Sequence, residues 1–344
     1  MTTDSNRFRN RLLALGLRNV ALLLILIYGK VNAAELIPKG QVVFEGSING
    51  STNISGLAPV TGFLAIAADE GVMVDLLQKQ SDGHYRLVQS IPLIKPDDDK
   101  VEIDVEGLTS NGNALYAIGS HSLTRKQVDP DEDYDKNRKR LTKVSHDDHR
   151  DNLFRLKINS DGTLDKKKSI DLRDLLKDDP ILGPFCEIPS KENGVDIEGI
   201  AFSEDRLFVG FRGPVLRQNH VPVMVLRFDS PDGYELRFVH LEGRGIRDIT
   251  QVNDGFLLIA GPVGDGDADY RFYFWDGKDG IPGTEHAASN LKLLGVIPCP
   301  PKAKAEGVTV IEETDQNYRV LVVYDGPENG NPTIFEVPKS SQQP

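Results

Sequence analysis

Short apolar runs separated by turn residues recur along most of the chain and share one frame. In four segments a leucine follows a Ser, Glu or Asp by nine positions. Each leucine lies in a run typical of a β-strand, such as FLAIA or RLFVGF. A fifth segment has the same start but carries extra residues, 312–317, before its matching run. The starts lie at 54–57, 105–108, 197–200, 247–250 and 305–308, which indicates internal repeats.

Each repeat continues with a third and a fourth strand-like run. In three repeats an Asp-Gly pair separates these runs, at Asp82-Gly83, Asp161-Gly162 and Asp232-Gly233. Asp-Gly is a strong hairpin signal because both residues tolerate the positive φ of tight turns. Four antiparallel strands per unit are typical of propeller blades. The pattern therefore predicts an all-β chain that forms a single β-propeller of five four-stranded blades.

The fifth repeat ends at 333–337 and lacks a fourth strand. Residues 41–48 offer one, and pairing between the N- and C-terminal strands would close the ring and protect two sheet edges. Six blades are the alternative, because a further blade has room between Glu106 and Glu198. That interval instead contains a charged stretch, 126–150, and a short predicted helix, 172–177.

Residues 1–33 have the pattern of a secretory signal peptide. Four arginines precede a short apolar run, 20–27, which is followed by Val31-Asn32-Ala33. We expect cleavage near Ala33, a propeller domain over 34–344, and a periplasmic or secreted location. An uncleaved membrane anchor is the alternative, although the run is shorter than the roughly 20 apolar residues that span a bilayer.

The charge balance argues against nucleic acid as a partner. The whole chain has a net charge of −12, and removal of residues 1–33 leaves 35 basic and 51 acidic residues, a net charge of −16. Nucleic-acid binding depends on basic side chains that contact phosphates. An acidic surface is compatible with a cationic ligand or a bound metal ion, and a solvated acidic surface is the ordinary alternative.

Only two cysteines occur, Cys186 and Cys299. In an oxidising compartment such a pair can form one disulfide, and two separate buried thiols are the alternative. A catalytic cysteine is not indicated, since no local motif supports it.

A propeller would gather polar residues at one mouth of its central channel. The first strand of each blade lines the channel and begins on the face where the second strand ends. Several carboxylates, one arginine and one histidine would then meet, and such a group suits acid–base catalysis or a hard cation such as Ca²⁺. The first strands supply Ser55, Glu106, Glu198, Asp248 and Glu306, and the second strands supply Asp69, His121, Arg212 and Asp325.

The same acidic residues have a structural alternative. A carboxylate at the start of an inner strand can accept backbone N–H bonds from the neighbouring blade. Repetition favours this role, because a catalytic site rarely needs the same group in every repeat. His121 and Arg212 break the repeat and are better functional candidates, although Arg212 can also serve only as the partner of Glu198.

Three long connections are expected at the same mouth, at 126–150, 172–195 and 264–269. The first is so charged that disorder is as reasonable a prediction as a lid. In the third, Asp265, Asp267 and Asp269 alternate as in a calcium loop, with Asp276 at the twelfth position. Tyr270 occupies the position where such loops need glycine, so this site is the weaker metal candidate.

Several segments resemble a bacterial family known as domain of unknown function 3616. The resemblance rests on 104–108 and 196–200 (D-V/I-E-G-L/I), on F-R-G-P at 211–214, and on VPVMVLRF. It implies a propeller fold and no established activity. The E-G starts are also similar to those of the esterase-like, phytase-like propeller group, which would imply a secreted hydrolase acting on phosphate esters. The chain departs from that group in lacking an obvious basic cluster for phosphate.

Two hypotheses follow. In the first, the protein is a metal-assisted esterase or phosphoesterase-like hydrolase. Its catalytic candidates are Glu198, Arg212, His121 and Glu106, and its metal candidates are Glu306, Asp248, Asp325 and Asp69, with calcium or another divalent cation as cofactor. In the second, a non-catalytic propeller binds a protein, sugar or cation. In either case we expect a monomer whose ligand is a small molecule or an extracytoplasmic partner.

Overall fold

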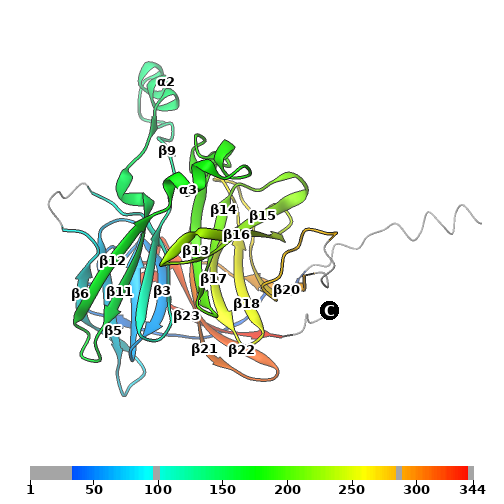
Figure 1. Cartoon of the computed structure of the whole chain (residues 1–344). Coiled ribbons are helices and arrows are strands. Elements are labelled where there is room, and N and C mark those ends of the chain that lie inside the picture. Colours follow the sequence, from blue (N-terminus) through cyan, green and yellow to red (C-terminus); the bar gives the residue numbers. More distant parts are fainter. Residues whose placement is uncertain (1–32, 96–100, 284–288, 340–344) are drawn as a thin grey trace, which may run out of the picture. The chain divides into compact units, whose positions relative to one another are not determined.

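The computed structural model describes residues 33–95, 101–283 and 289–339. The predicted signal peptide therefore lies outside the described residues, apart from Ala33. The described residues from Ala34 onward form one compact unit, in which antiparallel sheets are arranged around a common centre (Figure 1). None of the described helices is long and apolar enough to cross a membrane.

The sheets form a five-bladed β-propeller, as the repeats predict. Each blade is an antiparallel sheet whose strands follow one another outward from the centre. Blades 1 and 2 contain, in order, β3 (Ile54–Val60), β4 (Phe63–Ala68), β5 (Met73–Lys79) and β6 (Tyr85–Pro92), and β7 (Val105–Ser110), β8 (Ala114–Gly119), β11 (Asn152–Ile158) and β12 (Leu164–Asp171). Blades 3 and 4 contain β13 (Asp196–Ser203), β14 (Arg206–Gly213), β15 (His220–Arg227) and β16 (Ser230–His240), and β17 (Gly245–Val252), β18 (Gly255–Gly261), β19 (Tyr270–Trp275) and β20 (Leu291–Ile297). Blade 5 contains β21 (Lys304–Glu313), β22 (Asn317–Asp325) and β23 (Thr333–Pro338).

The N-terminal region closes the ring, but through an earlier segment than predicted. Strand β1 (Pro38–Gln41) pairs with β23 and is the fourth strand of blade 5. The next strand, β2 (Phe44–Glu45), instead pairs in parallel with β6 at the edge of blade 1. The predicted strand at 41–48 is thus divided between two blades. The prediction that an N-terminal strand pairs with the C-terminal strand is confirmed, but the predicted residues of that strand are corrected to 38–41.

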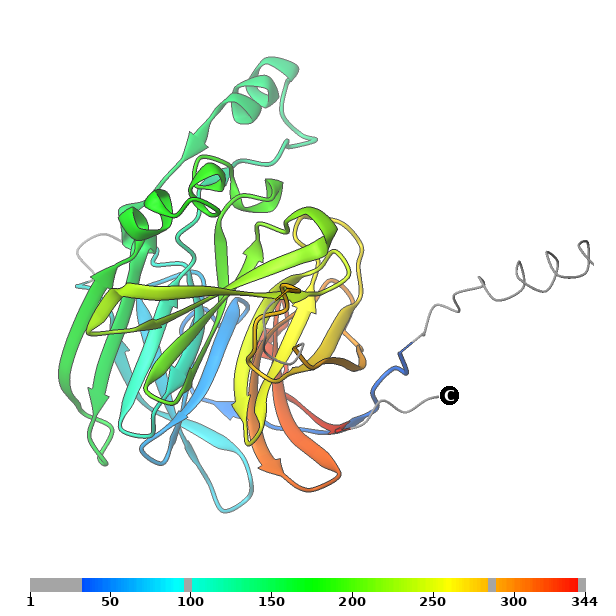
Figure 2. The ribbon, with the colours of Figure 1, turned by 45° about the vertical axis from the view of Figure 1, so that its right-hand side comes forward.

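Apolar side chains fill the spaces between neighbouring blades. The first strands contact one another in a closed ring, β3 to β7, β13, β17, β21 and back to β3. Between blades 3 and 4, the fully buried Trp275 packs against Phe208 and Phe256. Aromatic and branched side chains of this kind dominate the buried area, at about 25 cal/mol per Å² removed from water. Figure 2 shows the blades turned by 45°.

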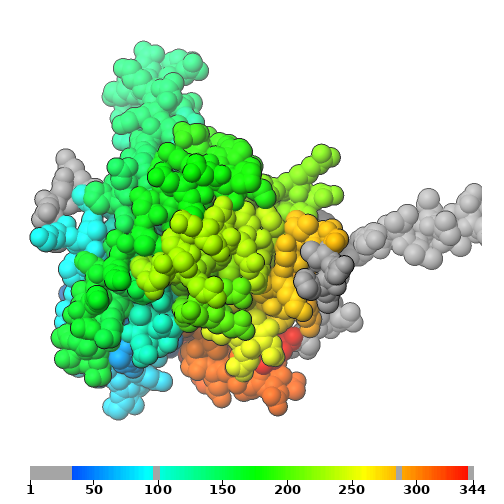
Figure 3. All heavy atoms as spheres, in the orientation of Figure 1, coloured from blue at the N-terminus to red at the C-terminus, as the bar shows by residue number. Residues whose placement is uncertain are grey.

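The interval between Glu106 and Glu198 contains no sixth blade. After β8 the chain forms a small hairpin, β9 (Thr124–Arg125) and β10 (Val144–Ser145), which carries helix α2 (Tyr134–Thr142). This segment is ordered, so the alternative of disorder is wrong. Helix α2 buries none of its residues and projects from the blades (Figure 3). The predicted helix at 172–177 is present as α3 (Arg173–Asp178).

Candidate functional site

In every blade, a residue near the start of the first strand is skipped in the pairing with the second strand. Such a β-bulge re-aims the skipped side chain. In blade 4 the skipped residue is Arg247, whereas the leucine spacing aligned Asp248 with the glutamates. The skipped residues are Ser55, Glu106, Glu198, Arg247 and Glu306.

In four of the five blades a glycine follows the skipped residue and allows the first strands to approach closely, whereas Asp248 follows Arg247 in blade 4. A Cβ atom on Gly199 would lie 2.8 Å from Cα of Asp248, and one on Gly56 would lie 3.0 Å from the backbone N of Leu108. The first distance is too short for a Cβ atom, and the second would force the neighbouring strand to move. The E-G pair is therefore a joint between blades: glycine provides the contact, and the bulge directs the preceding side chain to the centre.

Three glutamates from three blades converge there. Glu106, Glu198 and Glu306 are buried, and one carboxylate oxygen of each lies within 4.8 Å of the others. Two arginines form ion pairs with these carboxylates and offset part of their negative charge. Nη1 of Arg212 lies 2.7 Å from Oε1 of Glu198, and the same guanidinium contacts Asp196. The guanidinium of Arg247 contacts Glu306 and lies 3.3 Å from Oε2 of Glu198.

Burial opposes the charged form of both arginines, but the surrounding carboxylates outweigh it and raise the pKa of each guanidinium. Both therefore remain cations. Oε2 of Glu198 is buried without a hydrogen-bond partner among the described residues, because its contact with Arg247 lacks hydrogen-bond geometry. A buried carboxylate oxygen without a donor is costly and is a ready ligand atom.

Glu106 differs from the other two glutamates. Within the described residues it takes part in no ion pair or side-chain hydrogen bond. Burial raises its pKa well above the ordinary value, and Glu198, Asp104 and Glu306 raise it further. Folding without a metal ion therefore favours the protonated form of Glu106.

The glutamates line a cavity of about 240 Å³ at the mouth of the channel. Its lining includes eight acidic and five basic side chains, so the fully ionised site would carry a net charge of −3. Protons or a cation must offset this excess in a buried site. Asp69 belongs to the rim, where burial first and Glu306 second raise its pKa to about 8.

Two of the predicted mouth residues join blades instead. The hydroxyl of Ser55 donates to the backbone carbonyl of Val105 in the next blade. The carboxylate of Asp248 accepts the backbone N–H of Ile249 at 2.8 Å and that of Val308, in blade 5, at 2.6 Å. With both oxygens engaged, Asp248 does not share the convergence of the glutamates.

His121 and Asp325 are also placed apart from the three glutamates. The imidazole of His121 is buried, and its Nδ1 lies 2.8 Å from the carbonyl oxygen of Gly119. Nδ1 therefore carries the proton, since a carbonyl only accepts. Burial lowers the pKa of His121, and its ring is not among the groups that line the cavity. Asp325 pairs with Lys304.

The alternating aspartates at 265–269 do not form a calcium loop. Asp269 is engaged by Arg244 and Arg271, and Asp265 lies 3.4 Å from Nζ of Lys191. Strand β19 separates Asp269 from Asp276, and an extended chain rises about 3.3 Å per residue. The two ends of the expected loop are thus held far apart.

The two cysteines are free thiols, so the disulfide is not formed. Cys186 lies in the connection from blade 2 to blade 3 and Cys299 in the connection from blade 4 to blade 5. Burial raises the pKa of each thiol to about 11, which makes both poor nucleophiles.

Comparison with known proteins identifies the family. A family model described as "Protein of unknown function (DUF3616)" matches residues 53–333. The chain belongs to this family. The match extends from blade 1 into blade 5, and it confirms the resemblance inferred from 104–108, 196–200, 211–214 and VPVMVLRF. No curated protein matches the chain.

Solved structures with a similar chain course include several enzymes. A PQQ-bound aldose sugar dehydrogenase from Streptomyces coelicolor is 12% identical, with 88% of this DUF3616 chain and 98% of the other covered and a TM-score of 0.41. A putative 6-phosphogluconolactonase from Bacteroides uniformis is 13% identical, covers 85% and 73%, and has a TM-score of 0.36. A putative gluconolactonase is 14% identical, covers 90% and 97%, and has a TM-score of 0.35. Similarity at this level says nothing about the chemistry of the DUF3616 site.

Arg247 is the central residue of this DUF3616 site that sequence reasoning missed. It stands first in the fourth start, next to the aspartate that the leucine spacing selected. Counting back from the hairpin turn would have found it: Val252 pairs with Gly255 in blade 4, as Ser203 pairs with Arg206 in blade 3. Five residues before Val252 lies Arg247, and five residues before Ser203 lies Glu198.

The raised pKa values predict an unusual pH dependence for the metal-free protein. Folding holds protons on Asp69 and Glu106 that the unfolded chain releases above its ordinary carboxyl pKa values near 4. Stability should therefore fall as the pH rises from about 4 to about 8, the folded pKa of Asp69. Chemical denaturation at a series of pH values in the presence of a chelator measures this slope. Constant stability over the interval would mean that these carboxyls ionise freely in the fold.

Proposed function

We propose that this protein is a metal-assisted hydrolase of the esterase or phosphoesterase type, with its site at the mouth of the propeller channel. The observation that carries the proposal is the convergence of Glu106, Glu198 and Glu306 on a cavity with more anionic than cationic groups. Ser55 and Asp248 differ from these glutamates, because their side chains form hydrogen bonds with the backbone of the neighbouring blade and have a structural role.

The residues fit a hard divalent cation. Carboxylate oxygens are the ligands that Ca²⁺ prefers, and it takes six to eight of them. Glu106, Glu198 and Glu306 would supply the first ligands, and Asp69 on the rim adds a further carboxylate. A bound divalent cation would polarise a carbonyl or phosphoryl oxygen and lower the pKa of a water molecule.

The side chains around this set have separate roles in the proposed reaction. Arg212 and Arg247 are permanent cations that hold the glutamates in place and stabilise negative charge that develops on a substrate oxygen. Glu106, whose pKa is raised in the metal-free protein, is the group that would lose its proton when a cation binds. Once ionised, a glutamate of this set can accept a proton from an attacking water molecule.

Calorimetry of Ca²⁺ binding to residues 34–344 tests the proposal. We expect the wild-type protein to bind, and Glu198→Gln and Glu306→Gln to lose at least about tenfold in affinity, which corresponds to about 1.4 kcal/mol. Glu312→Gln is the matched control, because Glu312 lies exposed on the same strand as Glu306. A panel of phosphate and carboxylate esters then tests turnover. Absence of binding, together with variants that only melt earlier, would make the glutamates structural and end the hydrolase proposal.

A binding role is the second candidate, and helix α2 favours it. Tyr134 is 75% exposed, and Val128 and Leu141 are about half exposed on the same projecting segment. These side chains offer apolar area for contact with a partner. If the esters are not hydrolysed although Ca²⁺ binds, a calcium-stabilised binding propeller is the function to pursue.

A further inference from the structure

A larger cavity opens beside the acidic one. It has a volume of about 680 Å³, within the range of about 300–1,000 Å³ typical of small-molecule sites. One side is formed by the loop that contains Asp265, Asp267 and Asp269, and another by the chain from Val296 to Lys304. Lys191, Arg212, Arg247 and Lys304 line both cavities, so the two spaces adjoin. We call these four residues the junction.

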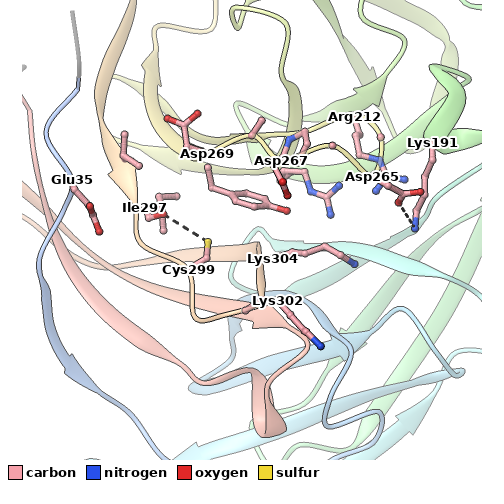
Figure 4. Close-up of a pocket in the computed structure, with 18 residues that line it drawn as sticks. Glu35, Lys191, Arg212, Asp265, Asp267, Asp269, Ile297, Cys299, Lys302 and Lys304 are labelled. Carbon is pink, nitrogen blue, oxygen red and sulfur yellow. Dashed lines mark hydrogen bonds and ion pairs between the residues drawn. The ribbon is translucent and has the colours of Figure 1, made fainter.

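All four junction side chains are cationic. In Figure 4, Lys191, Arg212 and Lys304 lie toward one end of the large cavity, and Glu35 lies at the other. Lys302 also lines the cavity, and within the described residues it takes part in no ion pair. Most nearby acidic groups are already engaged: Asp269 by two arginines and Asp265 by Lys191. Asp267 is exposed on the loop.

The two junction arginines also have unused donors. Nε of Arg212 and Nε of Arg247 are both buried and have no hydrogen-bond partner in the described part of the chain. Arg212 is 8% exposed and Arg247 is 2% exposed, so water can hardly compensate. A buried donor without an acceptor costs about 1–3 kcal/mol. The two guanidinium groups that line both cavities therefore have hydrogen-bonding capacity that the described residues do not use.

We infer that the junction binds an oxyanion, and that the substrate is therefore an anionic ester that carries a carboxylate or a phosphate group. The inference of an ester rests on the proposed hydrolase, whereas the anion site stands on the junction itself. Arginine and lysine donors make charge-assisted hydrogen bonds with either anion. The remainder of the substrate would occupy the large cavity, with its anionic end directed toward the glutamates.

A cation at the glutamates and an anion at the junction are compatible. Arg212 and Arg247 each already contact two carboxylates, which would repel a further anion in the metal-free protein. A divalent cation bound to the glutamates neutralises part of that charge. Anion affinity should therefore rise when Ca²⁺ is present, which links the two sites.

The test is calorimetric titration with inorganic phosphate and, separately, with malonate, each with and without Ca²⁺. We expect the wild-type protein to bind at least one of them, and Lys304→Gln to weaken that binding at least about tenfold. Lys304 is paired with Asp325, so its replacement can disturb the fold. Lys302→Gln removes a cation from the exposed rim instead, and should also weaken binding. Lys79→Gln, exposed in blade 1, is the matched control.

The outcomes separate the two proposals. Tighter binding of phosphate assigns a phosphoryl group to the ligand, and tighter binding of malonate assigns a carboxylate; both support the site. Binding of neither anion, or binding unchanged in Lys304→Gln and Lys302→Gln, overturns it. Anion binding without any Ca²⁺ binding would leave the junction in place and remove the metal-assisted hydrolase. Ca²⁺ binding without anion binding would do the reverse.

Discussion

Glu106→Gln is expected to make the metal-free protein more stable and to remove its stabilisation by Ca²⁺. Glu106 is buried, and its nearest charged neighbours include Glu198, Asp104 and Glu306. Burial and these like charges raise the pKa of Glu106, so folding is penalised at a pH where the unfolded chain has released the proton. Glutamine has the same shape and no charge, and its introduction removes that penalty.

The loss of Ca²⁺ stabilisation should be the larger effect. A ligand at about 1,000 times its Kd stabilises a folded protein by about 4 kcal/mol. The wild-type protein should gain this amount in saturating Ca²⁺, and Glu106→Gln should gain almost none. Thermal unfolding with Ca²⁺ and with a chelator measures both effects, and Glu312→Gln again serves as the control. A variant that melts earlier than the wild type and keeps its response to Ca²⁺ would show that Glu106 is structural.

Asp248→Ala is expected to lower the free energy of unfolding by about 2–5 kcal/mol, the cost of leaving two buried backbone donors unsatisfied. The donors are the N–H groups of Ile249 and Val308, and the second belongs to blade 5. Denaturation by guanidinium chloride measures the change. Asp254→Ala, in the exposed turn at the end of the same strand, should leave stability nearly unchanged.

Asp248→Asn completes this experiment. It keeps one acceptor oxygen and should fold, so its Ca²⁺ affinity can be measured even if the alanine variant does not fold. We expect that affinity to match the wild type. Lost Ca²⁺ binding with unchanged stability would mean that Asp248 is a metal ligand and not a link between blades.

The propeller was predictable because its blades repeat. Apolar runs at a fixed spacing reveal four strands per unit, and Asp-Gly marks the hairpins. The closing strand was misplaced for a physical reason. Strand β1 has the sequence PKGQ and is exposed along its whole length, so no apolar alternation marks it. Residues 42–44 are more apolar, so the closing strand was predicted to include them instead.

The candidate site was predictable only in part. The three glutamates and Arg212 follow from their places in the repeat. Arg247 does not, because the leucine of blade 4 lies one position further along its strand than the leucine of blade 3, relative to the hairpin turn. The nine-residue spacing therefore selects Asp248, although Arg247 occupies the place that Glu198 has in blade 3. Its partners, Glu198 and Glu306, belong to the two adjacent blades. Spacing along the chain cannot show such contacts, nor which carboxylates are already bonded to backbone.

The pairing of β1 with β23 also constrains how the chain is made. The fifth blade needs residues 38–41 and residues 333–338 at the same time, so the first strand must wait, unpaired, until the last one has been synthesised. The other blades can form in order behind it. The join also brings distant parts of the chain side by side, so new termini cut between two other blades would preserve every sheet. The fold thus depends on the order of the blades around the ring and not on which blade contains the chain termini.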